Sequence, residues 1–266
     1  MPERAIGIFD SGVGGLTVLR ELRCQMPTEE LVYLGDTARV PYGTKSPQTV
    51  QRYAQEAARF LVAQRVKLLV VACNTASAVA LDILSAAHQL PVVGVIEPGA
   101  RRALEKTQNG RIGVLGTEGT VRSGAYERAL HAGRASVEVF SAACPLFVPL
   151  AEEGWAEHPV ARLAAAEYLQ PLLDKGIDTL VLGCTHYPIL KKTLQEVVGP
   201  AVTLIDSAEE TAKQVHDLLA QRGLSRQSPE PGATRYFVTD IPDRFERVGS
   251  RFFGTPLEGV ITISLD

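Results

Sequence analysis

Cys73 and Cys184 are the two residues whose settings favour acid–base chemistry. Each follows a short apolar run and is followed in turn by an amide or hydroxyl residue. Ligands of open α/β sheets bind at the carboxyl ends of the strands, which is where both thiols would lie. A helix that begins beside a cysteine lowers the pKa of the thiol, because its free N–H groups stabilise the thiolate. We therefore predict that both thiols are reactive and act as catalytic acids or bases.

A free cysteine is more commonly a buried, unreactive core residue. The matching sequence environments of Cys73 and Cys184 argue against that interpretation for these two residues. Cys24, on an early predicted helix, and Cys144, before a proline, do not have this environment. We assign these last two to packing. The four cysteines form no CxxC pair and no zinc-type cluster, so we expect no metal site and, in a reducing compartment, no disulfide.

Polar residues beside the two thiols could bind an anionic substrate. Asn74, Thr75 and Thr185 directly follow the cysteines and supply hydrogen-bond donors. His186 lies two residues after Cys184, a placement that favours tuning of the thiol over a purely structural histidine. Glu152 lies in a predicted loop after an apolar segment, where a solvated acid is an equally good interpretation.

A glycine-rich turn, DSGVGG at residues 10–15, follows the first predicted strand. Such a turn forms a nest of N–H groups that binds anions. A dinucleotide site is disfavoured, because the spacing lacks the full GxGxxG and no acidic residue closes the second strand. Asp10 either caps the following helix, holds a substrate ammonium group or orients a proton carrier, and Ser11 lies beside it.

Two further loops can reach the same cleft. Pro41, Tyr42 and Gly43 follow the second predicted strand, and Tyr42 is placed either to reach a distal carboxylate or to form a structural turn. Thr117 and Thr120 occupy the turn that corresponds to the Asp10 turn in the second half of the chain, and we include them among the candidate substrate-binding residues.

These residues need a scaffold of alternating strands and helices. Short β-branched apolar runs predict buried parallel strands at Ala5–Phe9, Leu31–Leu34, Lys67–Ala72 and Val92–Ile96. Helical periodicity predicts helices at Gly14–Gln25, Thr49–Arg65 and Ala76–His88. This alternation is typical of a doubly wound parallel sheet.

The same pattern recurs later in the chain. The segment Ile6–Ser11 aligns with Ile112–Thr117 at an offset of 106, and the run ending in Cys73 aligns with the run ending in Cys184 at an offset of 111. A third alignment pairs residues 95–97 with 204–206 at an offset of 109. Three motifs at nearly constant offsets indicate an internal duplication, with the cleft on its pseudo-twofold axis.

The C-terminal segment has no counterpart in the second half. After a Ser- and Pro-rich loop at Leu224–Thr234, strands at Arg235–Thr239 and Val260–Leu265 are predicted to flank a helix near Asp243–Phe253. We expect this segment to complete the first half. The predicted fold is α/β, with two pseudo-symmetric doubly wound parallel-sheet domains, residues 1–97 with 208–266 and residues 98–207, and the active site between them.

Composition narrows the function classes. The 266 residues are 45% hydrophobic and 21% charged, ordinary values for a globular enzyme. The formal charge of −3, without a basic stripe, disfavours dedicated nucleic-acid binding. No apolar run approaches the roughly 18 residues of a membrane span, and the N-terminus runs straight into a predicted strand without a signal peptide. We therefore expect a cytoplasmic protein.

Five segments together resemble the signature of the glutamate racemase family. They are DSGVGGL (10–16), PYG (41–43), ACNTASA (72–78), EEG (152–154) and GCTHYP (183–188). ACNTA and GCTHYP in combination are the most specific, and the resemblance spans nearly the whole chain. It implies two α/β domains facing across a cleft, no cofactor, glutamate as substrate, and D-glutamate made for bacterial peptidoglycan. We also expect a homodimer.

The resemblance also implies residue roles. Cys73 would deprotonate D-glutamate with support from Asp10, and Cys184 would deprotonate L-glutamate with support from His186 and Glu152. The α-carboxylate of glutamate would be held by Asn74, Thr75 and Thr185. Its side-chain carboxylate would be held by Ser11 and the loop 41–43.

Racemisation requires that one group remove the Cα proton and that another return a proton from the opposite face, which two facing thiols can do. Three other functions stay open. An aspartate racemase of the same superfamily would share the thiol pair, although His186 argues against it. A cysteine hydrolase would need one thiol, a histidine base and an oxyanion hole, and it leaves the second thiol unexplained. A non-catalytic binding protein, such as a regulator of a DNA enzyme, is compatible with catalysis in the same chain.

Overall fold

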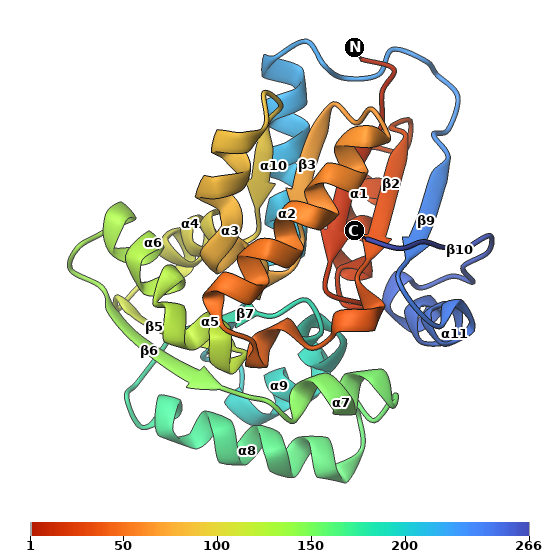
Figure 1. Ribbon diagram of the computed structural model, residues 1–266. Coiled ribbons are helices and arrows are strands. Elements are labelled where there is room, and N and C mark those ends of the chain that lie inside the picture. Colours follow the sequence, from red (N-terminus) through yellow and green to blue (C-terminus); the bar gives the residue numbers. More distant parts are fainter. Residues whose placement is uncertain (1, 266) are drawn as a thin grey trace.

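A computed structural model describes residues 2–265 and contains two parallel sheets. The first has the strand order β10-β9-β2-β1-β3-β4, and the second has the order β6-β5-β7-β8 (Figure 1). The strands of the first sheet are β1 (Ile6–Asp10), β2 (Leu31–Gly35), β3 (Leu68–Val71), β4 (Val92–Gly94), β9 (Thr234–Val238) and β10 (Ile261–Thr262). Those of the second are β5 (Arg111–Gly116), β6 (Glu138–Ala143), β7 (Thr179–Gly183) and β8 (Thr203–Asp206). The predicted fold class is confirmed.

Helices cover both faces of each sheet. Ile6 and Ile8 of β1 pack in one core cluster with α1, while Phe9 packs in another with α2 and α3, as the alternation of side chains along a strand requires. The helices are α1 (Leu16–Gln25), α2 (Pro47–Ala63), α3 (Asn74–Ala87), α4 (Ile96–Lys106), α5 (Glu118–Ser123), α6 (Ala125–Gly133), α7 (Phe147–Glu152), α8 (Pro159–Leu173), α9 (Lys191–Val198), α10 (Ser207–Gln221) and α11 (Pro242–Phe253). Short 3₁₀ turns are η1 (Thr37–Arg39), η2 (Tyr42–Thr44) and η3 (Tyr187–Leu190).

The two sheets repeat one strand order, which supports the predicted duplication. The order β2-β1-β3-β4 in the first half matches β6-β5-β7-β8 in the second. The third predicted alignment is wrong by three residues, because Leu69 pairs with Val92 whereas its equivalent Leu180 pairs with Leu204, an offset of 112. Ile96 opens α4 rather than ending a strand, since a short apolar run does not distinguish a strand from a first helical turn.

The C-terminal segment completes the first sheet, as predicted. β9 pairs with β2 and β10 pairs with β9, so both strands lie on the outer edge of that sheet (Figure 1). Between them α11 packs against α1. The bounds of the two predicted domains stay a prediction.

Cys24 is exposed, so its assignment to packing is wrong, whereas Cys144 is buried as expected. Cys24 follows the buried Leu22 by two residues, which is roughly 200° around the helix and therefore faces away from the core. All four cysteines are free thiols. Within residues 2–265, no helix has the length and apolar character needed to cross a bilayer.

Candidate active site

The two thiols line one small cavity between the halves, of about 50 Å³. Cys73 follows β3, and Cys184 follows β7. The cavity is lined by Ser11, Gly12, Val40, Pro41, Tyr42, Gly43, Cys73, Asn74, Thr75, Thr117, Val148, Glu152, Cys184, Thr185 and His186. Asp10 and Thr120 are buried directly behind this lining, where Asp10 bonds to Thr185 and Thr120 bonds to Thr75. The fold thus brings every predicted site residue together.

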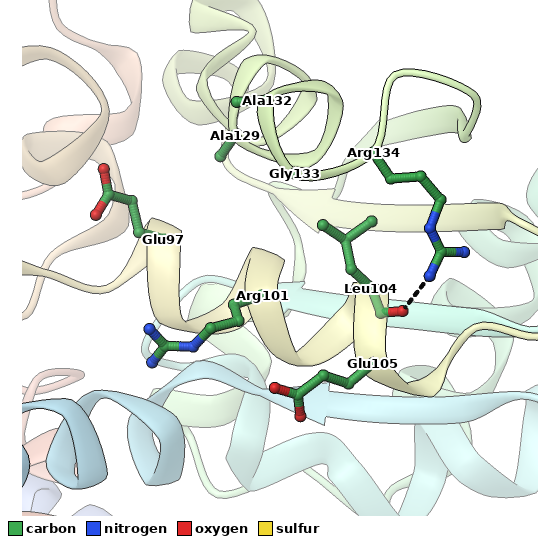
Figure 2. A pocket seen from close by; sticks show the side chains of 8 residues that line it. All are labelled: Glu97, Arg101, Leu104, Glu105, Ala129, Ala132, Gly133 and Arg134. Carbon is green, nitrogen blue, oxygen red and sulfur yellow. Dashed lines mark hydrogen bonds between the residues drawn. The ribbon is translucent and has the colours of Figure 1, made fainter.

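A larger groove of about 600 Å³ lies elsewhere, between α4 and α6. Figure 2 shows Glu97, Arg101 and Glu105 along α4, with Arg134 donating a hydrogen bond to the carbonyl of Leu104 at 2.8 Å. Its lining residues include no cysteine and no histidine. The smaller cavity is therefore the candidate active site, since it holds the two thiols and His186.

Cys73 is the N-cap of α3, and its carbonyl accepts a hydrogen bond from the Ser77 N–H at 2.8 Å. Cys184 does not begin an α-helix, contrary to the prediction. The reason is Pro188, which has no N–H at the position that would bond to the Cys184 carbonyl. Instead Tyr187 N–H reaches that carbonyl at 3.1 Å, and the chain continues as the 3₁₀ turn η3.

The Cys73 thiol is 5% exposed and lies 3.8 Å from Ser11 Oγ. Burial, together with the negative charge of Asp10, raises the pKa of Cys73 to about 12, against the lowering effect of the Ala76 N–H and of Ser11. The predicted lowering of this pKa is therefore wrong. Here the cost of burying a charge exceeds what the helix N-terminus supplies.

Cys184 has a hydrogen-bonded histidine–carboxylate pair beside it. Its Sγ lies 3.9 Å from His186 Nδ1, and His186 Nε2 lies 3.1 Å from Glu152 Oε1. Burial alone would lower the pKa of His186, but the hydrogen bonds with Cys184 and Glu152 raise it to about 10. Burial likewise opposes ionisation of Glu152, but His186 and Arg244 lower its pKa to about 2. These contacts favour the protonated form of His186, whose ring faces the Cys184 sulfur.

Asp10 joins the two halves rather than contacting a thiol. Its Oδ2 accepts a hydrogen bond from the Gly12 N–H at 2.9 Å, and its Oδ1 accepts one from Thr185 Oγ1 at 3.4 Å. Burial raises the pKa of Asp10. A substrate ammonium group placed beside this carboxylate would offset the cost of burying its charge, because opposite charges at short range attract each other. Support of Cys73 by Asp10 stays a prediction.

Tyr42 donates its hydroxyl to Asp36, so this group is already in use and is not free for a distal carboxylate. Asp36 is fully buried and also accepts hydrogen bonds from Arg39 Nε at 2.7 Å and Thr239 Oγ1 at 3.0 Å. The structure therefore favours the structural-turn alternative for the Tyr42 side chain. The backbone of the loop 41–43 still lines the cavity.

Asn74 carries a free donor into the site. Its Oδ1 accepts a hydrogen bond from Tyr126 Oη at 2.7 Å, while its buried Nδ2 has no hydrogen-bond partner among residues 2–265. A buried donor without a partner is costly, and an anion in the cavity would satisfy it. Beside it, the hydroxyl of Thr75 lies 2.9 Å from that of Thr117 and 3.2 Å from that of Thr120.

Tyr126→Phe is expected to raise the KM for the substrate about fivefold, because the Asn74 amide loses the bond that orients its donor. The measurement is steady-state kinetics beside Tyr168→Phe, a matched change on α8 away from the cavity. An unchanged KM in Tyr126→Phe would contradict the proposed orientation of the amide.

Glycines permit the close approach of the halves. A Cβ on Gly14 would lie 2.3 Å from Thr185 Oγ1 and 2.4 Å from His186 Nδ1, and one on Gly43 would lie 2.6 Å from Thr117 Cβ. Side chains at these positions would hold the cleft open. The glycine-rich turn therefore serves interdomain packing in addition to any anion binding.

Gly14→Ala is expected to destabilise the protein by about 1–3 kcal/mol, because the new methyl group overpacks the closed cleft. For a chain of this size the melting temperature should fall by roughly 3–10 °C. Gly133→Ala is the control, since its Cβ would meet only the flexible end of Leu104 within 3.5 Å. Equal melting temperatures for Gly14→Ala and the parent would refute this account of the turn.

Sequence analysis did not identify three residues that support the site: Tyr126, Arg244 and Phe252. Arg244 Nη2 donates to Glu152 Oε2 at 2.8 Å, and the Phe252 ring meets the His186 ring edge-on with centroids 5.2 Å apart. Each acts through a contact between residues far apart in sequence. No local pattern marks such contacts.

Comparisons with known proteins agree with this geometry. The family model described as Asp/Glu/Hydantoin racemase matches residues 16–215. The chain is 59% identical over 266 residues to a protein named glutamate racemase from Geobacter metallireducens, with 100% of this chain and 98% of the relative covered. It is similar to the crystal structure of a glutamate racemase isoform from Bacillus anthracis, with a TM-score of 0.96, 41% identity, and coverage of 100% and 99% of the two chains. The Francisella tularensis glutamate racemase in complex with D-glutamate gives a TM-score of 0.94 at 40% identity, with the same coverage.

Proposed function

Since the chain belongs to the Asp/Glu/hydantoin racemase family, we propose that it interconverts L- and D-glutamate by proton transfer at Cα between Cys73 and Cys184. The observation that carries this proposal is the pair of thiols lining one cavity from opposite halves of a duplicated fold. A single thiol with a histidine base would suffice for a hydrolase, which leaves the second thiol without a role.

The reaction balances without an added oxidant or electron acceptor. One cysteine thiolate takes the Cα proton, so the Cα–H bond breaks and an S–H bond forms. The opposite thiol then protonates the other face of the planar carbanion, so its S–H bond breaks and a new Cα–H bond forms. The enzyme is left with the two protonation states exchanged, ready for the reverse reaction.

Donors around the cavity would stabilise the carbanion. We assign the α-carboxylate to the free Asn74 amide and to Thr75 and Thr185, because charge that spreads onto that carboxylate is held by fixed donors in a water-poor site. The substrate ammonium group beside Asp10 would add a positive charge near Cys73. That charge favours the Cys73 thiolate, which burial alone disfavours.

Substrate entry requires the halves to separate. The cavity is only about 50 Å³ and is lined by residues of both halves, so opening of the cleft would make room for the substrate. Closing around the substrate would expel water and bring the thiols to the two faces of Cα.

We extend the proposal to the biological setting. The product D-glutamate would supply bacterial peptidoglycan synthesis, the enzyme would act in the cytoplasm, and the chain would form a homodimer. The full-length relatives named glutamate racemase support the formation of D-glutamate. Sedimentation of the purified protein tests the dimer.

The test of the activity is circular dichroism of L-glutamate with the purified enzyme, without pyridoxal phosphate, nucleotide or metal and with a chelator present. The signal should decay to zero as the racemate forms, and L-aspartate in the same assay should react far more slowly. Activity that appears only on adding a metal or pyridoxal phosphate would overturn the cofactor-independent mechanism, and faster turnover of aspartate would overturn the substrate.

A further inference from the structure

The helix α11 touches the His186–Glu152 pair at three points. Arg244 Nη2 donates to Glu152 Oε2 at 2.8 Å, and Arg251 Nη1 donates to the Glu152 carbonyl at 3.0 Å. Phe252, which is fully buried, packs its ring edge-on against the His186 ring at 5.2 Å. Since α11 belongs to the C-terminal segment of the first half and Glu152 ends α7 of the second, these contacts cross the cleft.

The contacts with Glu152 fix the orientation of the His186 imidazole ring. One oxygen of Glu152 faces His186 Nε2 and the other faces Arg244, so the carboxylate is held from both sides. With Nε2 engaged by Glu152, the other ring nitrogen, Nδ1, is the one that faces Cys184 Sγ. Without Arg244, the carboxylate would be held only through His186, and the orientation of the ring would be less fixed.

Among residues 2–265, only Cys184 has a histidine–carboxylate pair beside its sulfur. The side chain beside Cys73 is the hydroxyl of Ser11. The segment that contains α11 has no counterpart in the second half, whose sheet has four strands against six in the first. The appended segment therefore makes two otherwise similar thiols chemically different.

We propose that Arg244 is a positioning residue for the reaction, which acts through Glu152 to hold the His186 ring against Cys184 and so promotes the reactivity of that cysteine and not of Cys73. This inference rests on the proposed function, because it assigns a task in the same proton transfer. Arg244 does not touch the reacting atoms. Its side chain is 44% exposed, so its replacement is compatible with folding.

The test uses Arg244→Gln, Arg244→Lys and the matched control Arg247→Gln, an exposed arginine one turn further along α11. The first measurement needs no racemase activity: it is the rate of alkylation of Cys184 and of Cys73 by iodoacetamide in the free full-length enzyme between pH 6 and 9, resolved by peptide mass spectrometry. Cys73 reports cleft opening in the same molecule. The ratio of the two rates therefore isolates the effect on the Cys184 thiolate.

In Arg244→Gln the rate ratio of Cys184 to Cys73 should fall about fivefold near neutral pH, and kcat/KM for glutamate should fall about tenfold. Arg244→Lys should restore most of both values, since it returns the positive charge, and Arg247→Gln should match the parent. A ratio in Arg244→Gln equal to the parent's, or equal changes at both cysteines, overturns the proposal. If the parent did not racemise glutamate, the proposed function would fail while the alkylation ratio still tested the role of Arg244.

Discussion

Replacing either Cys73 or Cys184 by alanine is expected to lower kcat for glutamate racemisation by about 10³-fold or more, because one face of Cα then loses its proton carrier. Both substitutions should give nearly the same loss, since turnover in either direction uses both thiols. The measurement is kcat in both directions by circular dichroism, with the exposed Cys24 replaced by alanine as the control.

The two alanine variants should keep the fold. Each thiol lies at the cavity, and removing one sulfur from its wall leaves the strand and helix ladders unchanged. An unchanged far-ultraviolet spectrum therefore accompanies the expected loss. A Cys184→Ala enzyme that racemises L-glutamate at close to the parent rate would exclude the two-thiol mechanism.

His186→Asn is expected to lower kcat/KM by about 10²-fold, because the cation that faces Cys184 Sγ is lost. The equilibrium constant between enantiomers is one, so kcat/KM must fall equally in both directions. The asymmetry appears instead in the primary deuterium isotope effects at Cα. The effect should rise more with L-glutamate in His186→Asn, and more with D-glutamate in Asp10→Asn.

These isotope effects decide which thiol each polar residue supports. The measurement compares Cα-deuterated and ordinary glutamate of each hand in both variants. The same change for both enantiomers in both variants would contradict the assignment of His186 to Cys184 and of Asp10 to Cys73.

The strand ends that carry the chemistry were predictable from local sequence. The buried runs before Cys73 and Cys184 are short, β-branched and apolar, and a parallel strand covered on both faces requires that composition. The repetition of the motif then indicated two thiols at one cleft. The shared strand order of the two sheets supports that reasoning.

Other features depend on contacts that no local pattern records. Arg244 and Phe252 reach Glu152 and His186 across the cleft, and the sequence separation between Arg244 and Glu152 is 92 residues. Tyr126 likewise contacts Asn74 over 52 residues. These residues become visible only once the two halves have been placed against each other.

One error came from treating a helix N-terminus as decisive for the pKa of a thiol. At Cys73 the burial of the sulfur and the nearby Asp10 charge outweigh the N–H groups of α3. A second error, the helix predicted to begin beside Cys184, was avoidable from the sequence, because Pro188 stands where a helix would need an N–H. Local propensity and the cost of burial must therefore be weighed together.

The most direct test of the two-thiol mechanism is racemisation in deuterated water, followed early in the reaction by mass spectrometry of both enantiomers. Because one thiol removes the Cα proton and the other returns a solvent-derived one, the product should carry deuterium at Cα while the recovered substrate stays protonated. The same result is expected from either enantiomer. Deuterium that enters the recovered substrate as fast as the product would show a single shared base and contradict the account.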